Sequence, residues 1–284
     1  MSARRRGDAR RAVWLASPAI LWLLVFFLAP LAFVAVSSFL SRGVGGAPVA
    51  PATLEHYLRT VTVFRPVLVQ TLGFAVVTTA LSLVLGYPLA FFIASRRDGR
   101  VRLALLFLVL LPFWTNFLVR TYALITILQR EGPLASALQR LGLADDAVRF
   151  LYTEGAVVAG LVYGYLPFMV LPIYASVERL QRRYVEAAQD LGANDWHAFW
   201  RVVLPLTMPG VIAGSMLVFI PAIGAFVTPD LMGGTQGLMI GNLVQRQFGG
   251  RGNLPLGSAI SMVLLVVVFV SVLIYARWGS RDRA

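Results

Sequence analysis

One polar stretch between two long apolar runs, Tyr184 to Gly210, carries residue types at a spacing suited to docking another protein. Glu186-Ala187-Ala188 is followed by Gly192 and, after nine further residues, by Val202-Val203-Leu204-Pro205. Small alanine side chains let another backbone approach a helix closely, and glycine can end that helix because it tolerates the left-handed conformation. The chemistry predicted for this stretch is therefore close contact with a partner.

The second half of the stretch predicts how the contact surface is held. Trp196, Phe199 and Trp200 recur at three- and four-residue spacing and give an apolar stripe suited to a partner or to the membrane boundary. Pro205 and Pro209 are expected to interrupt the start of the next span. The stretch is thus predicted to form a helix, a turn and a second helix that project from the membrane, with the aromatic stripe as their support.

Missing residue types exclude several kinds of site. All 25 basic residues are Arg, so a phosphate-binding loop that ends in Gly-Lys-Ser/Thr cannot exist in this chain. Cys is absent, which removes disulfides, thiolate nucleophiles and Cys-ligated metals. His56 and His197 are too few and too far apart to suggest a metal site, and no Gly-x-Ser-x-Gly elbow is present. The sequence predicts no enzyme, no metal site and no cofactor in this chain.

The elements that must position these residues are membrane helices. The chain has 284 residues, of which 58% are hydrophobic and 13% charged, and its apolar residues come in long uninterrupted blocks. About 20 apolar residues are enough to cross a bilayer as a helix, whose backbone polar groups are bonded internally. The predicted fold class is all-α, a polytopic membrane protein with six transmembrane helices at about Val13–Leu40, Val67–Ala94, Leu103–Leu128, Gly155–Val177, Val203–Val227 and Leu256–Ala276.

Arginine counts predict the orientation, since positive residues resist translocation. The two tails and the 95–102 and 178–202 loops hold sixteen Arg, and the opposite-side segments hold eight. The protein is therefore expected in the cell (inner) membrane, with both termini and the 178–202 loop in the cytoplasm. The first apolar run is too long for a cleaved signal and is interpreted as an anchor. The net charge of +12 is interpreted as a topology signal, with no nucleic acid as partner.

Two outer loops follow from this topology, at about residues 41–66 and 129–154. Asp145, Asp146 and Glu154 make the second loop locally acidic. Such a loop suits a cationic ligand or a partner, or it is simply solvated.

The polar stretch resembles the integral membrane subunits of ATP-binding-cassette importers, whose signature reads Glu-Ala-Ala, three residues, Gly, nine residues, Ile-x-Leu-Pro. Val202 replaces the Ile, a conservative change. The resemblance implies the type I ABC importer permease fold and a coupling helix that sits in a groove of a cytoplasmic ABC ATPase dimer. ATP is then bound by that partner and not by this chain.

The resemblance also implies roles for single residues in the coupling loop. Glu186 would make a polar or ionic contact to the ATPase, and Gly192 would supply the turn. Ala187 and Ala188 would allow a close fit to the partner, and Leu204 and Pro205 form the Leu-Pro end of the matched signature.

Four further stretches resemble the first permease subunit of spermidine/putrescine importers, from about Leu21 to Ala276. They read LPFWTNFLVRTYAL, GLVYGYLPFMVLPIYASVERL, LPLTMPGVIAG and PDLMGGTQGLMIGNLVQRQF. This likeness implies a polyamine as substrate, a second homologous permease subunit and an extracytoplasmic polyamine-binding protein. Relatives with the same scaffold carry other solutes, so another small solute remains an alternative.

A polyamine site needs carboxylates for its ammonium groups and aromatic faces for cation–π contact. Asp230 stands where the fifth span ends, and we expect it to be the only acid near a span. Aromatic surface for the translocation path is expected from Trp114, Tyr122, Tyr163 and Tyr165. The alternative is that Asp230 caps a helix or loop and that the aromatic residues anchor the chain at the membrane interface.

Arg120 is unusual because an Arg within an apolar span is costly and should face the bundle interior or reach the interface. It would repel a polyamine, so it is interpreted as a structural partner of a carbonyl or an acid, or as a gating residue. The glycine pairs Gly160/Gly164, Gly210/Gly214 and Gly237/Gly241 have a four-residue spacing that permits close helix crossings.

Three domains are predicted. Residues 1–64 hold the basic tail, the first helix and an outer loop, residues 65–277 the permease core with the 178–202 coupling loop, and residues 278–284 a cytoplasmic tail. An ion-coupled secondary transporter is the alternative mechanism, but it usually needs several ionisable residues within the membrane, and here only Arg120 and Asp230 are candidates.

Overall fold

The computed structural model describes residues 2–142, 149–235, 237–250 and 252–279. Asp145 and Asp146 of the predicted acidic loop lie outside the described residues. The chain divides into two compact units. The first comprises Met1–Phe64 with Val244–Val266, and the second comprises Arg65–Leu243 with Val267–Ala284.

The first unit is built around a long helix and a small hairpin. Helix α1 (Ser2–Ser37) includes an apolar segment, Ala16–Ser37, in which only the terminal Ser37 is buried. Strands β1 (Leu40–Arg42) and β2 (Pro48–Ala52) pair antiparallel on either side of the 3₁₀ turn η1 (Val44–Gly46). Helix α2 (Glu55–Thr62) follows, and Tyr57 joins it to the end of α1 through a 2.7 Å hydrogen bond between its hydroxyl group and Ser38 Oγ.

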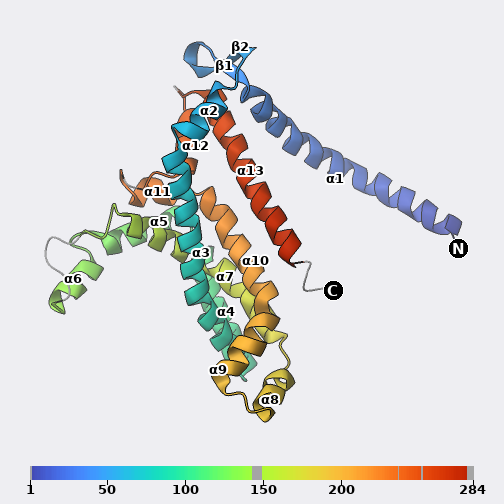
Figure 1. Ribbon diagram of the computed structural model, residues 1–284, viewed down its shortest axis with the longest axis vertical. Helices are drawn as coiled ribbons and strands as arrows, with labels where there is room; N and C mark the ends of the chain where they lie inside the picture. Colours follow the sequence, from blue (N-terminus) through green and yellow to red (C-terminus); the bar gives the residue numbers. More distant parts are fainter. Residues whose placement is uncertain (1, 143–148, 236, 251, 280–284) are drawn as a thin grey trace. The chain divides into compact units, whose positions relative to one another are not determined.

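Three long helices form the core of the second unit: α3 (Arg65–Ala94), α7 (Glu154–Glu178) and α10 (Leu204–Ile223). They lie side by side in Figure 1, and buried apolar side chains such as Ile93, Ile173 and Val218 fill the space between them. Close approach of α10 to α7 requires glycine, because a Cβ at Gly210 would lie 2.5 Å from the Pro172 carbonyl oxygen.

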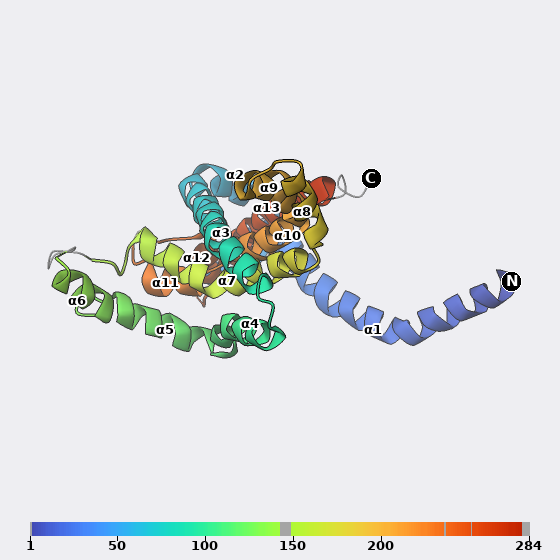
Figure 2. The same cartoon turned by 90° about the horizontal axis from the view of Figure 1, so that it is seen from below.

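The predicted third span, Leu103–Leu128, is wrong as a single helix. The structure breaks it into α4 (Gly99–Trp114) and α5 (Phe117–Leu128), which meet at 94° (compare Figures 1 and 2). Thr115 and Asn116 have extended backbones, and their side chains bond the free helix ends. Thr115 Oγ1 donates to the Pro112 carbonyl, and Asn116 Oδ1 accepts from the Leu118 N–H.

The expected interruption at Pro205 and Pro209 is also wrong. The chain stays helical from Asp195 to Ile223, through α9 (Asp195–Ala198), a π-helical turn η2 (Phe199–Val203) and α10. In the π turn, the Leu204 N–H donates to the carbonyl of Phe199, five residues back. This wider turn lies directly before Pro205, which has no N–H and would crowd a regular α-helix.

The remaining helices are α6 (Pro133–Arg140), α8 (Arg182–Asp190), α11 (Val227–Met232), α12 (Ile240–Phe248) and α13 (Leu254–Gly279). Among the described residues, five helical segments are long and apolar enough to span a membrane. A sixth span results if the bent α4 to α6 segment counts as one. The predicted polytopic all-α class is therefore confirmed, with one span broken.

Candidate functional site

The predicted helix, turn and second helix are confirmed at the end of the α3, α7 and α10 bundle (Figure 1). Helix α8 ends in the hydrogen-bond pattern typical of a left-handed cap. The Gly192 N–H donates to the Gln189 carbonyl at 2.8 Å, and the Ala193 N–H donates to the Ala188 carbonyl at 3.0 Å. Gly192 has φ of +87°, the conformation that favours glycine.

Two side chains fix the far side of the turn. Asn194 caps α9, since its Oδ1 accepts from the His197 N–H at 2.8 Å. Gln189 Nε2 donates to Asp195 Oδ1 at 2.8 Å and so links α8 to α9 directly. The loop is held by its own polar groups before any partner binds.

Phe199 alone of the predicted aromatic stripe anchors the loop to the bundle. Its ring meets Tyr87 of α3 edge-on at 5.5 Å and Phe91 at 6.4 Å. Trp196 and Trp200 pack against Phe199 and remain 66% and 50% exposed, so their outer faces are left for a partner or for the membrane boundary, as expected for the stripe. Helical periodicity identified the stripe without showing which member faces inward.

A buried hydroxyl pair extends this anchor. The Tyr87 hydroxyl group and Thr207 Oγ1 lie 2.8 Å apart, and Thr207 Oγ1 also donates to the Val203 carbonyl at 2.8 Å. This carbonyl ends the π turn, so α3 is bonded at the point where α9 passes into α10.

The outer surface of the loop presents the signature residues. Glu186 and Ala187 are exposed, Ala188 is half-buried, and Leu191 is 90% exposed. No hydrogen bond or ion pair of the Glu186 carboxylate occurs with another described residue. Leu204 and Pro205 lie in the first turn of α10, and Pro205 is exposed. A free carboxylate beside small and apolar side chains suits a protein partner.

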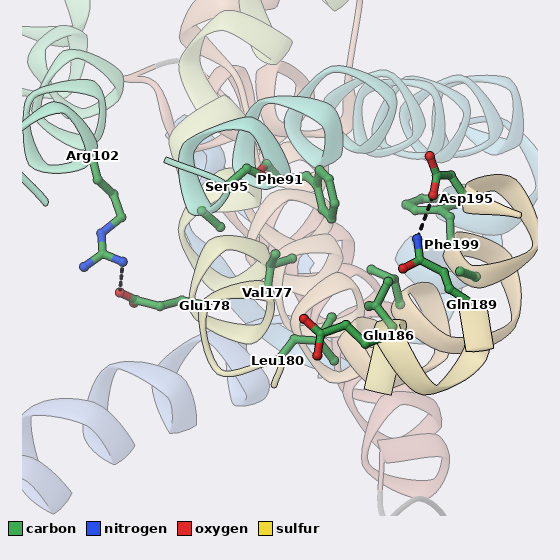
Figure 3. A pocket seen from close by; sticks show the side chains of 14 residues that line it. Phe91, Ser95, Arg102, Val177, Glu178, Leu180, Glu186, Gln189, Asp195 and Phe199 are labelled. Carbon is green, nitrogen blue, oxygen red and sulfur yellow. Dashed lines mark hydrogen bonds and ion pairs between the residues drawn. The ribbon is translucent and has the colours of Figure 1, made fainter. Parts of the chain in front are cut away.

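A cavity of about 620 Å³ lies between the loop and the ends of α3 and α7. In the view of Figure 3, the Arg102–Glu178 ion pair, 3.1 Å long, lies on one side and the Gln189–Asp195 hydrogen bond on the other, with Glu186 between them. Arg102 and Glu178 are both partly exposed and tie the start of α4 to the end of α7. The sequence did not single out this pair, because its members are 76 residues apart (178 − 102).

Asp230 lies outside the fifth span, in the short helix α11 that follows the break at Gly224. It is exposed, and its Oδ1 lies 3.4 Å from Asn242 Nδ2. Asn242 is buried and is itself fixed by the Phe226 carbonyl and the Met239 N–H. The carboxylate is thus accessible to a ligand and held by a neighbouring amide.

The aromatic candidates do not form one cluster. Trp114 is 72% exposed at the end of α4 and meets Phe107 of its own helix, and Tyr122 is 56% exposed on α5. Tyr165 is half-buried, and its hydroxyl group donates to the Pro221 carbonyl at 3.3 Å, which joins α7 to the end of α10. These three side chains are placed on different elements, and only Tyr165 has a clear packing role.

Tyr163 lines a mostly apolar cavity of about 1030 Å³ between α3 and α7. Glu154 lies at the first turn of α7, lines the same cavity and accepts a 3.5 Å hydrogen bond from Gln70 of α3. The expectation that Asp230 is the only acid near a span is therefore wrong, since Glu154 and Glu178 begin and end α7. The apolar pattern places Glu154 in a loop, because the predicted span starts one residue later.

Arg120 is buried in α5, at 9% exposure. Its guanidinium carbon lies 5.7 Å from the Phe117 ring and 6.0 Å from the Tyr163 ring. Nε and Nη1 have no hydrogen-bond acceptor in the described part of the chain, so the expected partner carbonyl or acid is not found for these atoms. Residues 2–142, 149–235, 237–250 and 252–279 likewise contain no group of three or more His, Asp or Glu suited to a metal ion.

A bundle of apolar helices with a polar loop projecting from one end defines a multi-span membrane protein. Residues 86–280 match the family described as binding-protein-dependent transport system inner membrane component, and the chain belongs to this family. It is 43% identical over 257 residues to the spermidine/putrescine transport system permease protein PotB of Escherichia coli K12, covering 90% of this chain and 93% of PotB. The PotB protein of Haemophilus influenzae is 43% identical over 260 residues, 90% of each chain.

The fold is shared with solved transporters. A bacterial ABC transporter that imports the acidic polysaccharide alginate has a chain with a TM-score of 0.72 at 19% identity, covering 98% of this chain and 99% of that chain. The MetNI methionine ABC transporter matches with a TM-score of 0.58 at 15% identity, over 76% of this chain and 94% of that chain. The type I importer permease fold implied by the sequence is confirmed by these likenesses.

Proposed function

We propose that this chain is a permease subunit of an ATP-driven importer and forms part of the translocation path for a polyamine. The proposed polyamine substrate is supported by the 43% identity, over nine tenths of the chain, to permeases named for spermidine and putrescine. Another small solute on the same scaffold is the competing assignment.

The motor is proposed to be a separate cytoplasmic ABC ATPase dimer. The exposed Glu186, Ala187 and Leu191 surface, on a loop clamped by its cap and by Gln189, suits insertion into a groove. A rigid loop can transmit a rocking motion, whereas a flexible one would absorb it. Because the chain has no Lys for a phosphate-binding loop, ATP is bound by the partner, and this chain needs no cofactor.

Two further partners complete the proposed assembly. One is a second homologous permease subunit, which would cover the membrane helices left exposed here, and the other is an extracytoplasmic polyamine-binding protein. The family description itself names binding-protein-dependent transport. Both termini and the coupling loop then lie in the cytoplasm, in agreement with the Arg distribution.

Amine recognition is assigned to the outer half of the second unit. Asp230 offers an accessible carboxylate, and Tyr163 and Tyr122 offer aromatic faces for cation–π contact. Glu154, which lines the cavity with Tyr163, is a second carboxylate for a ligand that carries several ammonium groups.

The substrate is tested by uptake into vesicles that contain the reconstituted complex. ATP-dependent accumulation of labelled spermidine or putrescine is expected, and Asp230→Asn is expected to reduce it about tenfold through loss of one charge pair. Uptake of neither amine by an assembled complex that hydrolyses ATP would contradict the polyamine assignment. Uptake that persists without ATP but stops with an ionophore would favour the ion-coupled alternative.

The coupling assignment is tested by charge reversal on one helix. Glu186→Lys is expected to leave membrane insertion intact and to lower ATP-driven uptake about tenfold or more, because a docked carboxylate is replaced by a cation. Asp190→Lys is the matched control, since Asp190 is also exposed on α8 but occupies one of the three unspecified positions of the signature. Equal uptake by both variants would contradict docking through Glu186.

A further inference from the structure

The Arg102–Glu178 ion pair has no part in the proposed substrate path or in the surface that meets the ATPase. Arg102 Nη1 lies 3.1 Å from Glu178 Oε1, and the two side chains are 36% and 40% exposed. A partly exposed pair of this kind adds little to the stability of a fold. Its position is more informative than its strength, because it connects two helices that differ in how firmly they are held.

Glu178 lies where the bundle passes into the coupling loop. It is the last residue of α7, and only residues 179–181 separate it from the start of α8. In this connection, the Leu180 N–H donates to the Val177 carbonyl at 3.1 Å, so the chain stays bonded to the end of α7. Glu178 and Glu186 of the loop also line the same cavity (Figure 3). Because the connection is short and hydrogen-bonded, a movement of α8 also moves the Glu178 carboxylate.

Arg102 lies in the first turn of α4, a helix that packs on the surface of the bundle. No residue of α4 is buried, although its partly buried Leu105, Leu106 and Val109 pack against the core. The chain joins the start of α4 to α3 through residues 95–98, and the end of α4 meets α5 at the 94° break. A helix without buried side chains can shift along its neighbours at low cost. The ion pair is therefore a direct contact between this loosely held helix and the helix that continues into the coupling loop.

We propose that the Arg102–Glu178 ion pair transmits the motion of the coupling loop to α4. When the ATPase moves α8, the end of α7 carries the Glu178 carboxylate with it, and the paired guanidinium draws the start of α4 in the same direction. Helix α4 ends directly before the break, so its motion changes the angle between α4 and α5. Arg102 and Glu178 are thus positioning residues that bind neither the amine nor ATP. This inference rests on the proposed coupling to an ATPase.

The ratio of uptake to ATP hydrolysis in the reconstituted complex tests this link. Arg102→Gln and Glu178→Gln are each expected to lower the spermidine taken up per ATP about fivefold, because the coupling between the loop and α4 is lost. ATP hydrolysis and assembly of the complex are expected to stay close to wild type. Arg100→Gln is the matched control, since Arg100 is also exposed in the first turn of α4. A wild-type ratio in both variants of the pair contradicts the link.

Exchange of the two charges distinguishes the link from a packing role. The double variant Arg102→Glu with Glu178→Arg keeps an ion pair between the same two positions and is expected to recover most of the lost uptake per ATP. Either reversal alone places two like charges together and is expected to be at least as impaired as the Gln variants. If the losses of the two reversals multiply in the double variant, the link is contradicted while the proposed function stands.

A distance measurement tests the motion without any amine. The chain contains no Cys, so spin labels can be attached at Leu108→Cys on α4 and Val76→Cys on α3, both exposed positions. Addition of ATP to the complex is expected to change the distance between the labels in the labelled chain. The further change Glu178→Gln is expected to abolish this effect of ATP. An equal effect of ATP with and without Glu178→Gln contradicts the link.

The same measurement separates a failure of the link from a failure of the proposed function. A complex that shows the ATP-dependent change but takes up neither spermidine nor putrescine contradicts only the polyamine assignment. A chain that binds no ATPase overturns the coupling assignment and the link together.

Discussion

At the scale of single residues, the coupling loop depends on one backbone conformation. Gly192 has φ of +87°, and a Cβ placed on it would meet nothing within 4 Å, so its requirement is conformational and not steric. A side chain in this region costs about 1 kcal/mol or more, because Cβ crowds the following carbonyl group.

Gly192→Ala is therefore expected to loosen the turn between α8 and α9 and to lower ATP-driven uptake severalfold without preventing insertion. Gly99→Ala is the control, because a Cβ there also meets nothing within 4 Å but φ is not in the left-handed region. Uptake and membrane content are compared for both variants. Wild-type uptake by Gly192→Ala would show that the loop tolerates a looser turn.

The residues of the loop could be predicted from sequence much better than those of the path. Glu186, Gly192 and Pro205 lie close together in the chain, so their spacing directly describes one local structure. Asp230 lies on α11, whereas Tyr163 and Glu154 lie on α7. These helices come together only through packing, which the spacing of residues in the sequence does not encode. The candidates of the path are selected by residue type, and the structure places Trp114, Tyr165 and Asp230 on three different helices.

At the scale of elements, the loop is connected to the bundle through one ring. Phe199→Ala is expected to lower the thermal stability of the purified chain, at a cost of about 2 kcal/mol, because a half-buried ring loses its contacts with Tyr87 and Phe91. Trp200→Ala, a change at a 50% exposed ring, is expected to leave stability nearly unchanged.

The same two variants distinguish a side chain that supports the loop from one that contacts the ATPase. If Trp200 belongs to the surface that meets the ATPase, Trp200→Ala weakens ATPase binding in a pull-down while Phe199→Ala weakens both binding and stability. A loss of stability in Trp200→Ala equal to that in Phe199→Ala would contradict this division of roles.

The close packing of α7 against α10 can be tested by comparing Gly210 with Gly164, since each belongs to a glycine pair with four-residue spacing. Gly210→Ala is expected to destabilise the bundle by about 1–3 kcal/mol, because its Cβ would overlap Pro172 and Ser176. Gly164→Ala is expected to be tolerated, since a Cβ there meets nothing within 4 Å. Thermal unfolding in detergent measures both, and equal effects would contradict the packing argument.

The predicted and observed helices differ mainly at the helix ends. Five of the six predicted spans correspond to long helices because twenty or more apolar residues have few other stable forms in a membrane. The break after Trp114 was missed because Thr115 and Asn116 interrupt the apolar run for only two residues. Their short side chains nonetheless bond both new helix ends, and that capping signal was present in the sequence.

At the scale of the whole molecule, the predicted topology can be tested because the chain lacks Cys. Single variants Leu191→Cys on the coupling loop and Val44→Cys beside the hairpin both place a thiol at an exposed position. In intact cells, a membrane-impermeant thiol reagent is expected to label Val44→Cys and not Leu191→Cys. Inside-out vesicles are expected to give the opposite result.

The wild-type chain provides the background for this experiment, since it has no thiol to label. Labelling of Leu191→Cys in intact cells would invert the topology and place the coupling loop away from any ATP. It would therefore contradict the proposed function as a whole.

The π turn at Phe199–Val203 has a consequence for how the loop is aimed. An α-helix rotates by about 100° per residue, and a π turn contains one residue more than the α-helical turn it replaces. Deleting one residue from this segment would restore a regular helix and swing α8 and Glu186 about 100° around the axis of α10. The direction in which the loop projects, and with it the direction of the proposed ATPase contact, is thus set by a residue count.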